Sequence, residues 1–371
     1  TRGADGAVAF PPPDGFTGNY VFRYRLHNVV GDSDAQVTIA VGARPVANSK
    51  SYPHTLVGNV GVNTAAGTPF SVLTGDQGDA LSIAFVAGSA TNGEAALNPD
   101  GTFTFNPAAG FRDGNASFQY TVRNGFGTSP AATVTVPVGS QVIWFVDNNA
   151  GACTAGCTGR MSHPFTTLAA FQAVNNGTGS NPADNHHVFL HESAADYTGP
   201  VQLRAGQRLI GQDASSGLAA LTGVTLPPHS TLPAMASGNG TFTRIVNGSG
   251  NGVVLGSNNR LHGLRLGNAS GSALSGSGFG TVTVSDVSVA TTGQALNLTT
   301  GVVSGGFAGL SSSGGTNNVA LTGVTTGGAT LALGTDSDAL SGATGDALRI
   351  SGGDGSFTYP GSITNTATLA V

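Results

Sequence analysis

The sequence predicts an all-β chain in which β-sandwich modules are followed by a right-handed parallel β-helix, or solenoid. Three observations support this prediction. An alternating apolar pattern recurs after about 95 residues near the start of the chain. Short apolar strands separated by Gly, Asn and Ser then recur every 20–25 residues or so from Val142 onward. Finally, charged residues make up only 9% of the chain, yet Val, Thr and Phe recur too regularly for a disordered protein.

The first third of the chain contains an internal repeat. The segment 5–10 (DGAVAF) recurs at 100–105 (DGTFTF), and aromatic residues further along match in the same register. Apolar and polar residues alternate in both copies, which is typical of β-strands with one buried face. We therefore predict one complete sandwich at 43–138 and the back half of an earlier one at 1–42. Since the front half of that earlier module is missing and the chain opens without Met, we expect a processed product or a fragment.

The segment 93–136, GEAALNPDGTFTFNPAAGFRDGNASFQYTVRNGFGTSPAATVTV, resembles the cadherin-like, Ig-like tandem repeats of very large bacterial surface proteins. The resemblance covers residues 1–138 and implies a spacer or adhesive stalk. Such repeats carry an acidic segment that can bind Ca²⁺. Here that segment retains only Asp76 and Asp79, whereas Ca²⁺ takes six to eight oxygen ligands. The alternatives are a weak Ca²⁺ site and a solvated turn.

From Val142 the pattern changes to that of a solenoid. An apolar strand at 142–146 precedes a short helix or capping turn within 164–174. Val254, Leu274 and Leu296 then follow small-residue turns at intervals of 20 and 22. One coil cannot bury its apolar row alone, so stacked coils form continuous inner ladders of aliphatic side chains.

A second ladder joins Leu261 to Val284, which lies 23 residues later. We place Leu321 in the same ladder, and its distance of 37 residues from Val284 predicts an insertion at Gly301–Gly315. Asparagine adopts left-handed conformations at little cost and is therefore expected at the corners between strands. The candidate corner residues are Asn251, Asn258, Asn268 and Asn318.

The runs VIWFVDNNAG, GQRLIGQ and NNRLHGLRLGNASGSAL resemble the pectin-lyase-like right-handed β-helices. The resemblance spans residues 142–371 and implies an N-terminal cap followed by coils, with a truncated C-terminal end. Lyases, glycosidases, phage tailspikes and non-catalytic adhesins share this fold, so the function must be argued from the site.

Carboxylates are scarce where an enzyme on this fold needs a pair for acid–base work or Ca²⁺. Asp286 is the only carboxylate between Asp213 and Asp336, so we expect the central coils to lack such a pair. Two weak catalytic candidates remain, both more easily interpreted as turn or loop residues: Asp336 with Asp338, and Glu192 with Asp196.

Three histidines, His186, His187 and His191, suggest a metal site. On a strand His187 and His191 share a face about 13 Å apart, which is too far for one ion, and His186 points the other way. We therefore expect them on the polar outer face of a strand.

Cys153 and Cys157 are the only cysteines. A disulfide is the preferred interpretation for an exported chain, with free thiols, or a metal site that includes His163, as alternatives.

Arg244, Arg260 and Arg265 fall in neighbouring predicted coils. A row of guanidinium groups on one lateral face would bind acidic glycans, although scattered solvated arginines are the simpler interpretation.

The composition of the chain limits the classes of partner that it can bind. The net charge of −5 and the single lysine, Lys50, argue against nucleic acid and against polybasic membrane contacts. No run of 18 apolar residues exists, so we expect no transmembrane helix. We expect a secreted or cell-surface bacterial protein that contacts matrix or cell-surface glycans or proteins and is not an enzyme. A polysaccharide lyase or glycosidase with an Ig-like stalk and a self-assembling filament subunit are the alternatives. No cofactor is expected beyond a weakly bound Ca²⁺.

Overall fold

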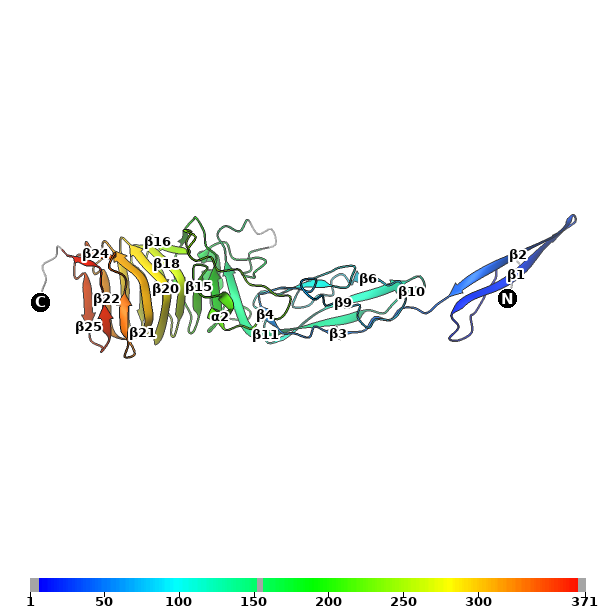
Figure 1. Cartoon of the computed structure of the whole chain (residues 1–371), viewed down its shortest axis with the longest axis horizontal. Helices are drawn as coiled ribbons and strands as arrows, with labels where there is room; N and C mark the ends of the chain where they lie inside the picture. The colour runs from blue at the N-terminus through cyan, green and yellow to red at the C-terminus, as the bar shows by residue number, and fades with distance from the viewer. Residues whose placement is uncertain (1–6, 152–155, 366–371) are drawn as a thin grey trace.

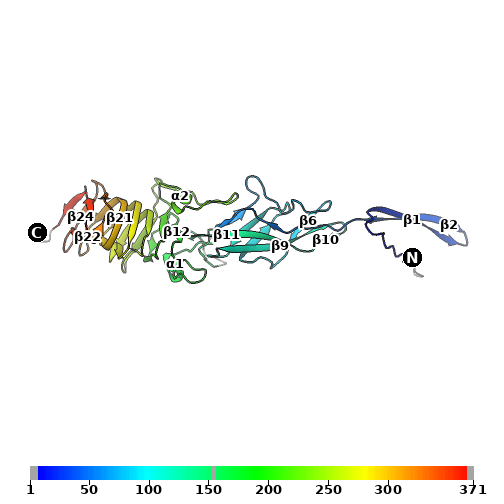
Figure 2. The same ribbon diagram turned by 90° about the horizontal axis from the view of Figure 1, so that it is seen from below.

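The computed structural model describes residues 7–151 and 156–365 of the 371-residue chain. An N-terminal hairpin, a β-sandwich and a β-solenoid follow one another along the axis of an elongated molecule (Figure 1; Figure 2). Strands dominate, and the described part contains only two short helices, which confirms the all-β prediction. In the same residues no helix has the length and apolar character needed to cross a bilayer.

The N-terminal hairpin is a two-stranded antiparallel sheet of β1 (Gly18–Asn28) and β2 (Gly31–Val41). The side-chain oxygen of Asn28 accepts the amide N–H groups of Val30, in the turn, and of Gly31, the first residue of β2. Phe22 and Tyr24 match core positions of the complete repeat, but here no described strand covers them, and Tyr24 is 44% exposed.

Two sheets form the sandwich between the hairpin and the solenoid. The larger sheet consists of β3 (Lys50–Ser51), β4 (Leu56–Gly58), β6 (Ser82–Phe85), β9 (Gly114–Asn124), β10 (Gly127–Thr128) and β11 (Ala132–Val146). The smaller sheet consists of β5 (Val62–Asn63), β7 (Gly93–Leu97) and β8 (Phe103–Pro107). Alternate residues of β9, namely Phe118, Tyr120 and Val122, are fully buried between the sheets, as the period of two predicts.

Beyond the sandwich all strand pairings between named strands are parallel, as a stacked solenoid requires. Its first coils contain β12 (His187–Leu190), β13 (Tyr197–Thr198), β14 (Val201–Gln202), β15 (Arg208–Gly211), β16 (Arg244–Asn247) and β17 (Val253–Val254). The middle coils contain β18 (Arg260–Ala269), β19 (Ser272–Ser277), β20 (Thr281–Thr291), β21 (Gln294–Ser312) and β22 (Val319–Thr325). The last coils contain β23 (Thr330–Leu333), β24 (Ala339–Ser341), β25 (Leu348–Ser351), β26 (Ser356–Thr358) and β27 (Ser362–Thr364). The right-handed sense of the coil stays a prediction.

An aliphatic ladder runs through the interior of the coils. Val253 aligns with Leu274, Leu274 with Leu296, and Leu296 with Val319, and all four are fully buried. The predicted ladder is therefore correct at Leu274 and Leu296. It is wrong by one position at Val254, which aligns with a serine of the next coil while its neighbour Val253 points inward.

The predicted insertion at Gly301–Gly315 is wrong. Val284 aligns with Gly305, so this segment is the next regular layer, within β21. Leu321 aligns instead with Leu298 on a different side of the coil. Val284 and Leu321 therefore belong to two different ladders, and the 37 residues between them do not measure one coil.

Asparagines mark the turns between strands, but mostly not by the expected backbone conformation. Of the four candidates only Asn258, with φ of 58°, adopts the left-handed region. The side-chain oxygens of Asn251 and Asn268 instead accept amide N–H groups from the next coil. Asn318 is fully buried and donates to oxygens of its own coil and of the next one.

The sandwich and the solenoid share one strand and one core. The first part of β11 pairs with β9 of the sandwich, and its end pairs with β12 of the solenoid. The segment 212–243, which contains α2 (Leu218–Thr222), covers the outer face of the first coils, and the other helix, α1 (Leu168–Val174), packs against β13 and β14. Val57 of the sandwich joins Phe145, Phe189 and Leu218 in a buried cluster under this cover. The junction is therefore continuous in both hydrogen bonding and packing.

Candidate functional site

One corner of the solenoid carries an aspartate where neighbouring coils use glycine. β18 bends at Gly263, whose φ is 61°, and a Cβ there would lie 2.1 Å from the backbone nitrogen of Ala214. The register between β18 and β20 places Asp286 at the equivalent corner, with φ of 54°. Ser215 donates to the Asp286 carboxylate from its amide N–H (3.0 Å) and its hydroxyl (2.7 Å). A non-glycine residue whose backbone adopts this sparsely populated conformation suggests a functional position.

Beside this corner the Arg265 guanidinium stacks on an aromatic ring. Its carbon lies 3.3 Å from the centre of the Phe242 ring, which is a cation–π contact. Arg244 aligns with Arg265 in the preceding coil, but it donates to both carboxylate oxygens of Asp196 at 2.5 and 2.7 Å. Within the described ranges, no hydrogen bond or ion pair engages the guanidinium of Arg265. Its positive charge is therefore available to a ligand.

Two hollows flank the stack, and both are lined by Phe242 and Arg265. The larger, of about 310 Å³, is also lined by Asp196 and Arg244. The smaller, of about 200 Å³, is also lined by Asp213 and Asp286. We call these two hollows together the lateral groove. Its charged and aromatic lining residues are Asp196, Asp213, Phe242, Arg244, Arg265 and Asp286.

An unfilled acceptor lies in the same groove. One carboxylate oxygen of Asp213 accepts the amide N–H of Thr243 at 2.5 Å, whereas the other is buried without a hydrogen-bond partner among the described residues. Buried polar atoms in proteins are normally paired. The lateral groove thus combines a free guanidinium, an unfilled carboxylate oxygen and an aromatic ring. Two arginines and three aspartates leave it with one net negative charge, so it suits hydroxyl groups, which both donate and accept, better than a polyanion.

The predicted row of three arginines is wrong for Arg260. This residue lies before the bend at Gly263 and aligns with Arg208 on another side of the coil. Only Arg244 and Arg265 share one face, because the left-handed corner turns the strand between the two halves of β18.

Glu192 and Asp196, one of the two catalytic candidates, are both engaged by other side chains. The carboxylate of Glu192 accepts from the side-chain amide of Asn239 at 2.8 and 2.9 Å. Asp196 is the ion-pair partner of Arg244. The structure brings both near the larger hollow, but each already has a partner.

Asp336 and Asp338 occupy the turn between β23 and β24, not one strand face. Burial disfavours the charge of Asp338, but the hydrogen bonds that it accepts outweigh this effect and lower its pKa. Donors include the amide of Thr335 at 2.7 Å and the hydroxyl of Ser311 at 2.8 Å. An anion held in this way closes a turn and does not donate a proton as a general acid would.

The histidines do not lie on a polar outer face. His186 and His187 are only 7% and 5% exposed. His186 packs against the indole of Trp144, whereas His187 lies on the face of β12 that segment 212–243 and the sandwich cover. Burial lowers the pKa of each to about 4, with a smaller effect of Arg112 on His186 and of Arg208 on His187. Burial also lowers the pKa of His191. No group of three or more His, Cys, Asp or Glu residues within 7–151 and 156–365 could hold a metal ion.

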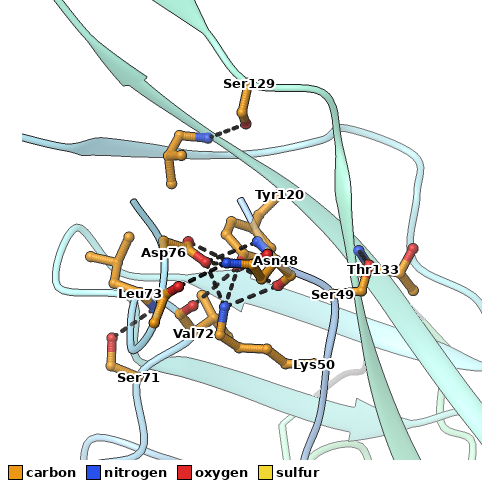
Figure 3. A network of polar contacts seen from close by, with 12 residues as sticks. Asn48, Ser49, Lys50, Ser71, Val72, Leu73, Asp76, Tyr120, Ser129 and Thr133 are labelled. Carbon is orange, nitrogen blue, oxygen red and sulfur yellow. Dashed lines mark hydrogen bonds and ion pairs between the residues drawn. The ribbon is translucent and has the colours of Figure 1, made fainter. Parts of the chain in front are cut away.

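The two candidate Ca²⁺ ligands, Asp76 and Asp79, differ in burial and in their neighbours. Asp76 has a fully buried side chain, and the Lys50 ammonium lies 2.6 Å from its carboxylate (Figure 3). Asp79 is exposed and lines a separate hollow next to the hairpin. An ammonium, and not a second carboxylate, therefore faces Asp76.

The predicted disulfide lies partly outside the described residues, because Cys153 falls in the gap 152–155. Cys157 is described and packs against the solenoid core. The pairing stays a prediction.

The sequence did not indicate the role of Phe242, nor that Asp213 and Asp286 line the same hollow. One usable signal was present: in TVTVSDVSV the alternation changes phase between Val284 and Val287, which marks a corner at Asp286. The central strands themselves contribute only Asp286 to this hollow, as expected, and the second carboxylate, Asp213, comes from segment 212–243 outside those strands.

Comparisons with known proteins concern different parts of the chain. No curated protein matches it. An endo-fucoidan hydrolase of glycoside hydrolase family 107 is 18% identical over 37% of this chain and 23% of the hydrolase, with a TM-score of 0.18. A variant of that hydrolase gives a TM-score of 0.20 at 18% identity, over 51% and 24% of the two chains. The chain thus spans about a quarter of either hydrolase, and the likeness carries no argument. Residues 44–137, in contrast, match the family model of the bacterial Ig domain, as the Ig-like resemblance predicts.

Proposed function

We propose that this chain is a structural and adhesive segment of a secreted or cell-surface bacterial protein. The bacterial Ig domain supports a place in a surface protein. The continuous strand β11 and the shared core support a stiff connection between the sandwich and the solenoid. In this proposal the sandwich is a spacer, and the solenoid, which resembles the pectin-lyase-like β-helices, is a rod that presents a ligand surface.

The ligand surface is the lateral groove, and its ligand is an uncharged glycan. The observation that carries this assignment is the free guanidinium of Arg265, stacked on Phe242 and next to the unfilled oxygen of Asp213. Sugar hydroxyls can accept from the guanidinium and donate to the carboxylate, while the ring packs against an apolar surface. Since Arg244 is already neutralised by Asp196, a strongly acidic glycan finds too little positive charge here.

Binding of the full chain to immobilised neutral and acidic oligosaccharides tests this proposal. Arg265→Ala should weaken binding of the neutral ligand about 10-fold or more, as expected for a central anchoring arginine. Arg260→Ala is the matched control, since it removes the same charge from another side of the coil. Equal losses in the two variants, or a preference for acidic glycans that disappears with both, would contradict the proposal.

A second candidate, a glycan-cleaving enzyme, is favoured by one observation: Asp213 and Asp286 line the same hollow. We propose that the groove binds without turnover, because Asp286 is held by two donors from Ser215. Release of reducing ends or unsaturated products by the wild-type chain, abolished by Asp213→Asn, would establish the enzyme instead.

A further inference from the structure

The chain's single lysine is almost completely enclosed in the sandwich. Lys50 lies on β3 with its side chain 14% exposed. Its ammonium contacts the backbone oxygen of Asn48 at 2.9 Å, a carboxylate oxygen of Asp76 at 2.6 Å and the hydroxyl oxygen of Tyr120 at 2.8 Å (Figure 3). An ammonium has three N–H donors, so these three oxygens satisfy all of them. We call these four residues the ammonium cage.

The carboxylate of the cage depends on this ammonium. The Asp76 side chain has no exposure to solvent, and it also accepts the amide N–H of Asn48 at 2.9 Å. The Tyr120 hydroxyl lies 3.0 Å from both carboxylate oxygens. Burial is the largest cause that raises the pKa of Tyr120, and the Asp76 carboxylate raises it further. The hydroxyl therefore stays protonated and donates to the carboxylate. A buried carboxylate without a cation would be strongly unfavourable.

The cage also connects segments that are distant in the sequence. Asn48 lies just before β3 and Lys50 begins it, Asp76 lies in the loop between β5 and β6, and Tyr120 belongs to the central strand β9. The side-chain amide of Asn48 adds a bond to the carbonyl of Gly75 at 2.7 Å. Losing the central cation would therefore loosen the loop that contains Asp76 from the sheet.

We propose that the ammonium cage is a cation site that the chain fills with its own lysine, so that the sandwich is stabilised without Ca²⁺. The three oxygens come from a carboxylate, a carbonyl and a hydroxyl, which are also ligand types for hard metal ions. With Lys50 in place the ion pair is formally neutral and offers no excess negative charge to a divalent ion. Replacing Lys50 with aspartate places two carboxylates around the same position, which is the charge that a Ca²⁺ ion balances. The inference is independent of the proposed glycan groove.

The first experiment compares wild type, Lys50→Asp and Lys50→Asn as full-length chains, with hydrogen exchange of β9 amides and thermal unfolding as readouts. Wild type should give the same values in chelator and in Ca²⁺. Lys50→Asp should melt about 10 °C or more lower in chelator, as expected for loss of a buried pair, and should recover in Ca²⁺. Lys50→Asn should be destabilised to a lesser degree and should not recover, since it lacks the second carboxylate. Stabilisation of wild type by Ca²⁺, or the same response of both variants, would overturn the proposal.

The second experiment needs no variant. Because Lys50 is the only lysine, an amine-reactive reagent reports on it alone apart from the chain terminus. Labelling of Lys50 in the folded chain should be slower than in urea by about 100-fold or more, since it requires local opening of the cage. Rapid labelling in the folded chain would refute the enclosed ammonium. An intact mass lower by one water, mapped to Lys50 and Asp76, would also refute it, because the pair would then be an amide and not an ion pair.

Discussion

Mild acid should destabilise the solenoid through two buried histidines, His186 and His187. The Nδ1 atom of His186 accepts the indole N–H of Trp144 at 3.0 Å and the amide N–H of Ala183 at 3.1 Å, so it cannot carry a proton without losing both bonds. Burial is the main reason why the pKa of each histidine is lowered to about 4, compared with about 6.5 in an unfolded chain. As the pH falls below 6.5, the unfolded state therefore binds protons that the folded state does not.

The size of the effect follows from these two pKa values. The contribution of each histidine is complete above pH 6.5 and is progressively lost down to about pH 4. At pH 5 the loss is about 2 kcal/mol for each histidine. A free energy of unfolding of about 5–15 kcal/mol would thus fall by a large fraction.

Urea unfolding of the full chain at pH 8 and pH 5 measures this loss. Trp144 is the only tryptophan, so its fluorescence reports on the first coil directly. His187→Gln should reduce the loss by about 2 kcal/mol. A loss of less than about 1 kcal/mol in wild type, or an unchanged loss in His187→Gln, would refute the assignment of buried neutral histidines.

Two further predictions concern the interior and the corners of the solenoid. Leu296→Ala, in the inner ladder, should lower the free energy of unfolding by about 2–5 kcal/mol in urea titrations. Ile350→Ala, at a position 45% exposed, is the control and should lower it far less. Similar losses in the two variants would contradict the ladder. Gly263→Ala should destabilise by about 1–3 kcal/mol or more, because its φ is 61° and its Cβ would collide with the backbone of Ala214. Gly125→Ala is the control, with open space around its Cβ, and a neutral result for Gly263→Ala would exclude the tight corner.

The features that the sequence predicts correctly are those set by local periodicity. Alternation along Phe118 and Tyr120 identifies a strand with one buried face, and the structure places both side chains in the sandwich core. The interval between Leu274 and Leu296 gives the length of one coil, and the two residues are register partners. Each of these patterns requires only that neighbouring residues share one element.

Predictions that require knowledge of the corners fail. A coil has several sides, and a spacing between apolar residues is meaningful only when both lie on the same side. Val284 and Leu321 do not, and the difference between them appeared as an insertion. Arg260 and Arg265 are close in sequence but are separated by the bend at Gly263. The physical reason is that one residue with positive φ redirects the strand without changing its composition.

The groove and the buried histidines depend on contacts that no local pattern encodes. Segment 212–243 leaves the coil between β15 and β16, covers the outer face of β12 and brings Asp213 beside Asp286. The same cover explains why His187 is buried and why a carboxylate oxygen of Asp213 lacks a partner. A position on the outside of a coil is therefore polar and solvated only where nothing packs over it. In this chain, segment 212–243, more than the regular coils, determines where a ligand groove forms and whether His187 is buried.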